Sequence, residues 1–168
     1  MPRTVEVEAP YLDQLLNNKK LLRQILSAIH AGTEVDIIID ELLGGEKYGI
    51  TLSRCGNKLC AYIYADSTSS INPLELEKGY GVQVAEIKIG DITIGDTKVS
   101  NVKIYGTQNS ATDEFYAVAE GDAELPLPRN IQELEADLDK LYAIYDKMTN
   151  IADEYIDKAL KLVKEEVI

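Results

Sequence analysis

The spacing of apolar residues changes several times along this chain, and each change marks the start of a new element. Residues 4–9, TVEVEA, alternate apolar and charged residues, which predicts a short strand with one solvated face. From Tyr11 to Ala31, apolar residues recur at intervals of three and four, which predicts an amphipathic helix that ends at Gly32. We expect Asn17 and Asn18 to divide it into two shorter helices.

The middle of the chain, from Thr33 to Glu120, loses the helical spacing and is rich in β-branched residues and tyrosine. Its apolar runs have the length of strands and are bounded by turn-forming residues. NPLELEKG, at residues 72–79, begins with Asn-Pro and ends with glycine, which predicts a short helical turn. Short connections favour antiparallel pairing of the strands, which we expect at residues 35–40, 47–55, 58–66, 81–89 and 114–120.

Residues 86–106, EIKIGDITIGDTKVSNVKIYG, resemble three copies of a five-residue unit. Their apolar residues change parity at each Gly-Asp or Ser-Asn pair, and parity along a strand changes only at a bulge or a turn. We therefore predict a bulge near Gly90, a tight hairpin at Gly95 and Asp96, and a second bulge near Ser100. A solenoid coil would need more repeats, and a calcium loop would need a bidentate glutamate, so these alternatives fit less well.

A segment with two prolines, GDAELPLPRN at residues 121–130, is expected to be a linker. After it, apolar residues step by three and four from Ile131 onward for more than four heptads, and Asn130 is placed to cap this long helix. Its apolar face is wider than the seam of a two-stranded coiled coil, because Tyr142 and Ile144 occupy positions that are usually charged. We expect the helix to cover the concave side of the sheet, and the alternative is a bundle of more than two helices.

Together these elements predict an α+β fold, with an antiparallel β-sheet of about six or seven strands packed against a long C-terminal helix and with an N-terminal helix or helical pair. We expect residues 1–168 to form a single domain. Within it, residues 1–128 hold the N-terminal helix and the sheet, and residues 129–168 hold the long helix. With 45% hydrophobic residues, the chain has enough apolar material for one sizeable core.

The charge of the chain limits its partners. A formal net charge of −12 speaks against nucleic acid, since phosphate backbones are bound by surfaces rich in lysine and arginine. No apolar run approaches the roughly 20 residues that cross a bilayer, and the first residues lack the apolar stretch of a signal peptide. We therefore expect a cytoplasmic protein that binds neither nucleic acid nor membranes.

Two cysteines, Cys55 and Cys60, bracket a Gly-Asn turn between two expected strands, so their thiols are placed to face one another near the end of a hairpin. Free buried thiols, a disulfide and a zinc site shared between subunits all fit this spacing. Two thiolates are only half of a tetrahedral zinc site, and the one histidine, His30, lies far away in the sequence. A disulfide inside a cell would be typical of a hyperthermophile.

The sequence contains no serine-hydrolase, zinc-protease, phosphate-loop or EF-hand motif, so we expect neither a cofactor nor covalent catalysis. Tyrosine is the conspicuous excess, with ten tyrosines against one phenylalanine and no tryptophan. Because a tyrosine combines apolar area with a hydroxyl that seeks a partner, tyrosines of the sheet and of the last helix could line an amphipathic pocket between them. Ordinary core filling is the alternative. The candidate ligand-binding residues are Tyr62, Tyr64, Tyr105 and Tyr116 on expected strands and Tyr142, Tyr145 and Tyr155 on the last helix.

The order of the expected elements, with a strand, a helical pair, six antiparallel strands and a long C-terminal helix, resembles the helix-grip (START-like) superfamily. The stretch VEAPYLDQLLNNKK near the start is similar to the strand, proline and helix entry of that superfamily. The resemblance spans nearly the whole chain but carries no catalytic or binding motif. It implies a curved sheet that wraps the last helix, and a non-catalytic protein that holds a small apolar or amphipathic ligand between the sheet and the C-terminal helix.

Two other classes of function fit the same elements. If NPLELEKG forms a full helix, the order of helices and strands resembles that of the acidic dimeric secretion chaperones. The chain would then be a homodimeric chaperone or adaptor that binds a partner polypeptide. Alternatively, the wide apolar face of the last helix serves self-assembly, and the chain is a structural subunit.

Overall fold

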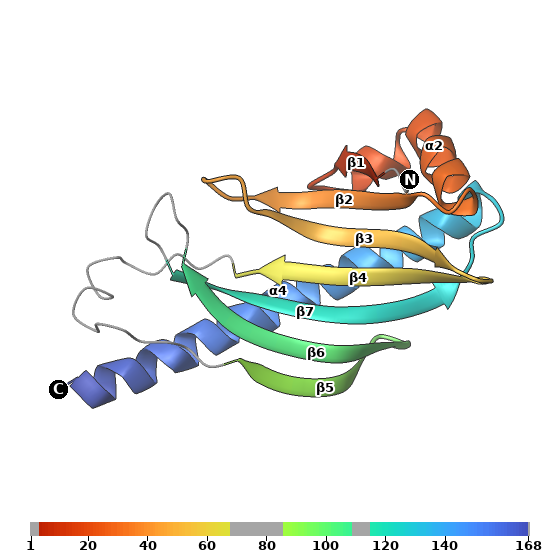
Figure 1. Cartoon of the computed structure of the whole chain (residues 1–168). Helices are drawn as coiled ribbons and strands as arrows, with labels where there is room; N and C mark the ends of the chain where they lie inside the picture. The colour runs from red at the N-terminus through yellow and green to blue at the C-terminus, as the bar shows by residue number, and fades with distance from the viewer. Residues whose placement is uncertain (1–3, 68–85, 109–114, 168) are drawn as a thin grey trace.

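A computed structural model of the protein describes residues 4–67, 86–108 and 115–167 (Figure 1). The described helices are α1 (Leu12–Leu16), α2 (Lys19–His30) and α4 (Ile131–Val167). The described strands are β1 (Thr4–Glu8), β2 (Glu34–Glu41), β3 (Lys47–Cys55), β4 (Lys58–Asp66), β5 (Ile87–Ile94), β6 (Thr97–Gln108) and β7 (Phe115–Pro126). The short helical turn expected in NPLELEKG lies outside the described residues, as does the first part of the strand expected at residues 81–89.

The seven strands form one sheet in the order β1-β2-β3-β4-β7-β6-β5. β1 and β2 pair in parallel, because the helices α1 and α2 connect them as a crossover. The remaining neighbours pair antiparallel. The predicted α+β fold, with a mostly antiparallel sheet and a long C-terminal helix, is confirmed.

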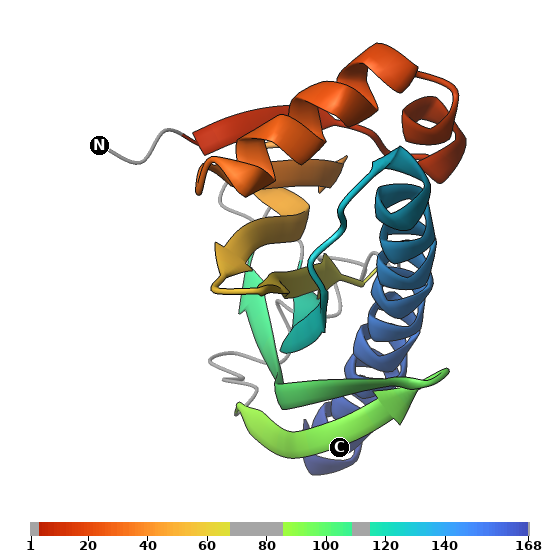
Figure 2. The same ribbon diagram turned by 90° about the vertical axis from the view of Figure 1, so that its right-hand side faces the viewer.

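α4 lies across one face of the sheet, which curves around it (Figures 1 and 2). We call this the helix face of the sheet and the opposite one the outer face. Every second residue of the central strands points to the helix face, and these residues are apolar or small: Leu59, Ala61, Ile63 and Ala65 on β4, and Ala119, Gly121, Ala123 and Leu125 on β7. A curved sheet on a long C-terminal helix is compatible with a helix-grip arrangement.

Gly121 on β7 lies where β6 and α4 both pack against the helix face of the sheet. A Cβ atom added to Gly121 would lie 2.7 Å from Cγ1 of Val99 and 3.4 Å from Cε of Met148. The helix residues that meet the sheet here, Leu141 and Met148 among them, are fully buried. The described part of the sheet–helix interface is therefore closely packed around Gly121.

The N-terminal helices close one end of the molecule against the start of α4 (Figure 2). The predicted division of this segment is confirmed, since the side chain of Asn18 accepts a hydrogen bond from the backbone N–H of Leu21 at 3.1 Å and begins α2. The Tyr142 hydroxyl donates to the carbonyl oxygen of Ala9 at 2.6 Å, which links α4 to the end of β1. On α2, Nε2 of His30 lies 2.7 Å from the carbonyl oxygen of Pro128.

The repeated stretch at residues 86–106 is a bulged hairpin. Ile94 and Thr97 pair across a tight turn at Gly95 and Asp96, as predicted. The register of β5 shifts on either side of Gly90, which has a φ of +90°, and the register of β6 shifts between Ser100 and Lys103. Both predicted bulges are therefore confirmed, and the solenoid and the calcium loop are not what this segment forms.

The predicted C-terminal end of β7 was wrong. The sequence predicted a strand at residues 114–120 followed by a linker, whereas β7 continues to Pro126. Residues 121–126 alternate small or apolar residues with Asp122 and Glu124, and this alternation is a strand pattern that the two nearby prolines hid. The extra length of β7 provides part of the candidate functional site.

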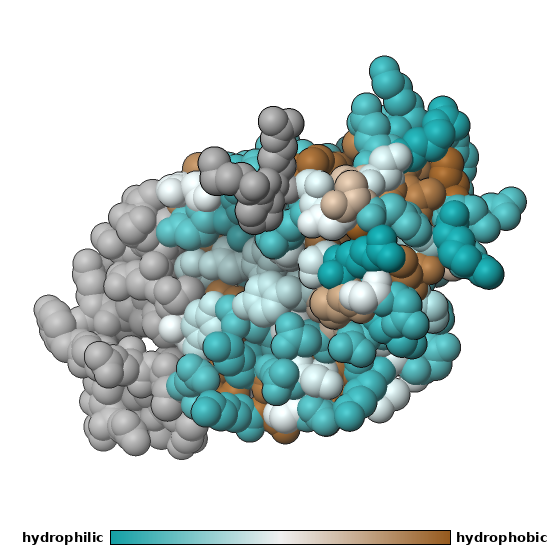
Figure 3. Space-filling view, turned by 45° about the vertical axis from the view of Figure 1, so that its right-hand side comes forward, coloured by the Kyte–Doolittle hydropathy of each residue, from teal (hydrophilic) through white to brown (hydrophobic). Residues whose placement is uncertain are grey.

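Figure 3 shows one side of the molecule, where hydrophilic residues predominate and apolar residues form separate patches. The large exposed hydrophobic side chains include Val5 on β1 and Ile87 and Ile89 on β5, which are the two edge strands of the sheet. None of the described helices is long and apolar enough to cross a membrane.

Candidate functional site

The outer face of the sheet carries polar and aromatic side chains arranged in rows. Residues that pair directly across strands point to the same face, so the register defines each row. The central row crosses five strands and consists of Asp36, Thr51, Tyr62, Asp122 and Ser100. On one side of it lies a row of Ser53, Cys60 and Glu124. On the other side lies a row of Tyr64, Glu120 and Lys103.

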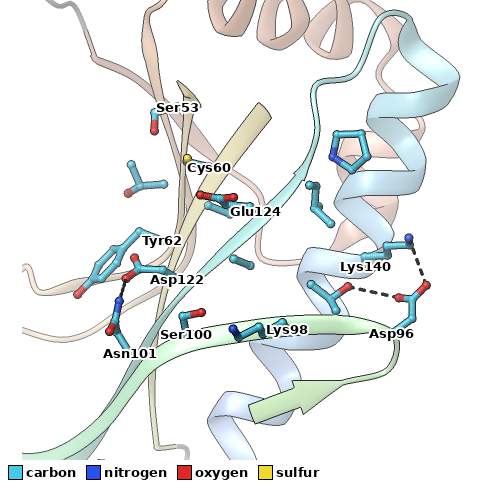
Figure 4. Close-up of a pocket in the computed structure, with 16 residues that line it drawn as sticks. Ser53, Cys60, Tyr62, Asp96, Lys98, Ser100, Asn101, Asp122, Glu124 and Lys140 are labelled. Carbon is cyan, nitrogen blue, oxygen red and sulfur yellow. Dashed lines mark hydrogen bonds and ion pairs between the residues drawn. The ribbon is translucent and has the colours of Figure 1, made fainter. Parts of the chain in front are cut away.

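Residues of the central row and of the row that contains Cys60 form the floor of a pocket of about 890 Å³, which we call the outer-face hollow (Figure 4). It forms where β6 separates from β7, since their pairing starts at Val99 and Ala123 whereas β7 continues to Pro126 beside β4. Lys140 of α4 and the turn between β5 and β6 border the hollow on the side where the strands separate. Its volume is within the range of about 300–1,000 Å³ that is usual for small-molecule sites.

Hydrogen bonds and ion pairs fix the two ends of the hollow (Figure 4). At one end, Asn101 occupies the bulge of β6 with a φ of +56°, and its side-chain N–H donates to Asp122 at 3.2 Å beside the ring of Tyr62. At the other end, Nζ of Lys140 lies 3.6 Å from a carboxylate oxygen of Asp96. The bulge that the sequence predicted therefore aims a polar side chain at the floor of the hollow.

A chain of tyrosine rings extends from the hollow along the sheet. Tyr62 is 37% exposed and stacks on Tyr64, with ring centroids 5.2 Å apart. Tyr48 lies 6.1 Å from Tyr64 and meets Tyr116 edge-on at 5.9 Å. The hydroxyls of Tyr48 and Tyr116 are hydrogen-bonded at 2.6 Å. The exposed ring of Tyr62 is thus held in place by a row of aromatic neighbours.

Glu120 organises the hydroxyls next to the hollow. The Tyr105 hydroxyl donates to one oxygen of Glu120 at 2.6 Å, and Nζ of Lys103 lies 3.4 Å from the other oxygen. Burial, and after it a hydrogen bond to Glu120, raise the pKa of both Tyr62 and Tyr105. Both hydroxyls therefore stay protonated and act as donors at neutral pH.

A second polar cluster lies between the end of β4 and α4. Asp66 is buried, and its carboxyl group hydrogen-bonds to that of Asp40 and to the hydroxyl of Tyr145. Burial is the largest cause that raises the pKa of Asp66 to about 8, followed by the hydrogen bond and the charge of Asp40, while Asp153 on α4 adds to the effect. Asp66 is therefore neutral at pH 7 and can donate its proton to Asp40. This cluster satisfies buried polar groups and joins β2, β4 and α4.

The sheet separates the seven candidate tyrosines into two sets. Tyr62, Tyr64, Tyr105 and Tyr116 lie on the outer face, as their register with Asp122, Glu120 and their neighbours requires. Tyr142, Tyr145 and Tyr155 are buried in the core with α4. The structure brings strand tyrosines together on the outer face, whereas the helix tyrosines belong to the core on the other side of the sheet.

The two cysteines are joined. Sγ of Cys55 and Sγ of Cys60 form a disulfide, and their Cα atoms are 5.8 Å apart, so the disulfide is the state that the structure contains. Cys60 lies on the floor of the hollow, in the row where it pairs with Glu124. Within residues 4–67, 86–108 and 115–156, no group of three or more histidine, cysteine, aspartate or glutamate side chains could hold a metal ion.

Sequence reasoning missed Tyr48 and the acidic residues of β7, Glu120, Asp122 and Glu124. A signal for the correct face was present in KLCAYIYAD, where Tyr62 and Tyr64 have the parity opposite to that of the apolar residues. That parity places the two tyrosines away from the core. The same rule places Asp122 and Glu124 on the outer face, but it applies only once β7 is known to extend past Glu120.

Comparison with known proteins gives no relative for this chain. No model of a protein family, no curated protein and no solved structure shows significant similarity to it. The function proposed for the chain therefore depends on the geometry of its own side chains.

Proposed function

We propose that this protein binds a small amphipathic molecule in the outer-face hollow, without covalent chemistry. The observation that carries the proposal is the central row, in which Thr51, Tyr62, Asp122 and Ser100 come from four adjacent strands and share one floor. This row combines two hydroxyls, a carboxylate and an aromatic ring. A ligand with an apolar body could stack on the ring while its polar groups bond to the hydroxyls and the carboxylate.

The position of these groups supports binding because the scaffold is rigid. Each side chain stands on a strand that is paired on both sides, so its orientation is set before a ligand arrives. Asn101 fixes the carboxylate of Asp122 at 3.2 Å, and Tyr64 supports the ring of Tyr62 from one side. Pre-organised groups lose little conformational entropy on binding, which favours affinity for a small molecule.

We also propose, from the order of its elements, that the chain is a distant member of the helix-grip superfamily. Its ligand would then lie on the other side of the sheet from the cavity that this resemblance implies. The reason is the packing of the helix face, where Leu138, Leu141 and Met148 are fully buried and Gly121 leaves no room for an added Cβ. The helix face is closely packed around Gly121, whereas the outer-face hollow offers open volume.

A fragment screen on ¹⁵N-labelled protein tests this proposal. Fragments that carry an aromatic or aliphatic body and one polar group are expected to shift the backbone amides of Thr51, Tyr62, Ser100 and Asp122. The variant Tyr62→Ala should weaken the hits by about threefold to tenfold, because it removes the stacking ring. Tyr11→Ala is the matched control, since Tyr11 is an exposed tyrosine on the N-terminal segment, and it should leave the hits unchanged.

Two other outcomes would contradict the proposal. Hits that shift Ile63, Leu141 and Met148 instead would place the ligand between the sheet and α4. Native mass spectrometry of the purified protein provides the second readout, because it reports the number of subunits and any retained molecule. An obligate dimer that retains a polypeptide, with no fragment binding in the hollow, would favour the chaperone or adaptor instead.

A further inference from the structure

The outer-face hollow is acidic along one wall. Asp122 and Glu124 both point from β7 into the hollow, and both are exposed. Asp122 accepts a hydrogen bond from Asn101, which is neutral. Among the described residues, neither carboxylate has a lysine or arginine within 4.0 Å. The β7 wall therefore presents two negative charges that the protein does not neutralise.

The lysines that reach the hollow already have acidic partners. Nζ of Lys98 lies 3.2 Å from a carboxylate oxygen of Asp91, and Lys140 is paired with Asp96. These pairs remove much of the positive field from the β6 side of the hollow. A bound anion would face Asp122 and Glu124 without an uncompensated lysine, whereas a bound cation would face two carboxylates.

Tyr62 adds a second feature that favours a cation. Its ring lies directly beside Asp122, because these two residues pair across β4 and β7. The face of a tyrosine ring carries partial negative charge and attracts ammonium groups within about 6 Å. The charge of Glu120, next to the Tyr62 hydroxyl, is paired with Lys103, so the negative field at the ring comes from its own face and from Asp122. A carboxylate and an electron-rich ring side by side are suited to an alkylammonium group.

The spacing of the two carboxylates indicates more than one positive charge. Asp122 and Glu124 are separated by one residue on the same face of a strand, which places them about 7 Å apart. An aliphatic chain with ammonium groups separated by roughly four carbon atoms matches that distance and lies along β7. We infer that the ligand of the outer-face hollow is an aliphatic diamine or polyamine, held between the ring of Tyr62 and the carboxylates of Asp122 and Glu124.

This inference rests on the proposed function, and its test uses three probes that share one carbon skeleton. Putrescine carries two ammonium groups, butanediol two hydroxyls and succinate two carboxylates. We expect isothermal titration at low ionic strength to show that putrescine binds about tenfold more tightly than butanediol, with no binding of succinate. Added salt should weaken putrescine binding, because exposed ion pairs are screened.

Variants locate the binding in the hollow rather than on an acidic surface in general. Asp122→Asn and Glu124→Gln should each weaken putrescine about threefold to fivefold, and Tyr62→Phe, which keeps the ring, should weaken it less than Tyr62→Leu. Glu154→Gln is the matched control, because it removes one exposed charge from α4 roughly 20 Å further along the helix than Lys140. This control should bind putrescine as the wild type does.

The outcomes separate this inference from the function on which it depends. Equal weakening by Glu154→Gln and Asp122→Asn would show non-specific binding to an acidic protein and would overturn the inference. If butanediol or succinate binds in the hollow as tightly as putrescine, the hollow is a binding site but not one for amines. If none of the three probes shifts residues of the hollow, the diamine is excluded, and the fragment screen decides whether the hollow binds another class of molecule.

Discussion

At the scale of single residues, the most unusual environment is that of Asp66. Asp66 is 3% exposed, and its carboxyl group is hydrogen-bonded to Asp40 and Tyr145. Burial and the neighbouring carboxyl raise its pKa from 3.8 in the unfolded chain to about 8. The folded protein therefore binds a proton more tightly than the unfolded one. The resulting stabilisation is complete below about pH 4 and is lost as the pH rises through about 8.

The variant Asp66→Asn should make stability less dependent on pH. Asparagine is neutral at every pH and can still donate a hydrogen bond to Asp40, so the variant avoids the cost of a buried charge. We expect it to gain about 1–3 kcal/mol of unfolding free energy relative to the wild type between pH 5 and pH 9. Urea denaturation at a series of pH values measures this difference. The exposed control Asp146→Asn should keep the wild-type slope, and a wild-type slope in Asp66→Asn would contradict the assignment.

At the same scale, only part of the candidate site could be predicted from the sequence. The tyrosines were recognisable as an excess, and their distribution between the two faces follows from strand parity alone. The environment of Glu120 and the bond from Asn101 to Asp122 were not recognisable, because each joins residues about 15–21 positions apart through a register that the sequence does not state. Side chains on neighbouring strands meet only after the pairing is known.

At the scale of elements, the packing of β6 beside β7 on the helix face depends on Gly121. Its added Cβ would come within 2.7 Å of Val99, so Gly121→Ala should force β6 or α4 to move and should destabilise the protein by about 1–3 kcal/mol. Thermal or urea denaturation measures the loss. In the double variant with Val99→Ala the new methyl group gains space. The double variant should therefore be destabilised by less than the sum of the two single variants. Strict additivity would show that the Val99 side chain does not contact the position of the new methyl group.

The local elements were predictable where their signals are local. Asn18 and Asn130 cap their helices, and Gly95 and Asp96 form the hairpin turn, because a cap or a turn requires particular residue types within a few positions. The end of β7 was not predictable in the same way. Its prolines are tolerated at the end of a strand, and only its pairing with β4 through Pro126 extends it beyond the expected linker.

At the scale of the whole molecule, the order of the strands could not be predicted from the sequence. β7 lies between β4 and β6, so the hairpin of β5 and β6 forms one edge of the sheet, and β1 forms the other. Nothing local distinguishes this order from a simple meander, since both bury the same apolar faces. The order nevertheless creates the site, because the separation of β6 from β7 opens the hollow beside Asp122 and Glu124.

The proposed function gives the two faces of the sheet different roles, with α4 packed on the helix face and the ligand on the outer face. Labelling the ring carbons of the ten tyrosines with ¹³C tests this division directly. On titration with putrescine, or with the best fragment from the screen, the ring signal of Tyr62 should shift first, followed by those of Tyr64 and Tyr105. The buried rings of Tyr142 and Tyr145 should stay unchanged. Shifts confined to Tyr142 and Tyr145 would place the ligand between the sheet and the helix and would contradict the outer-face site.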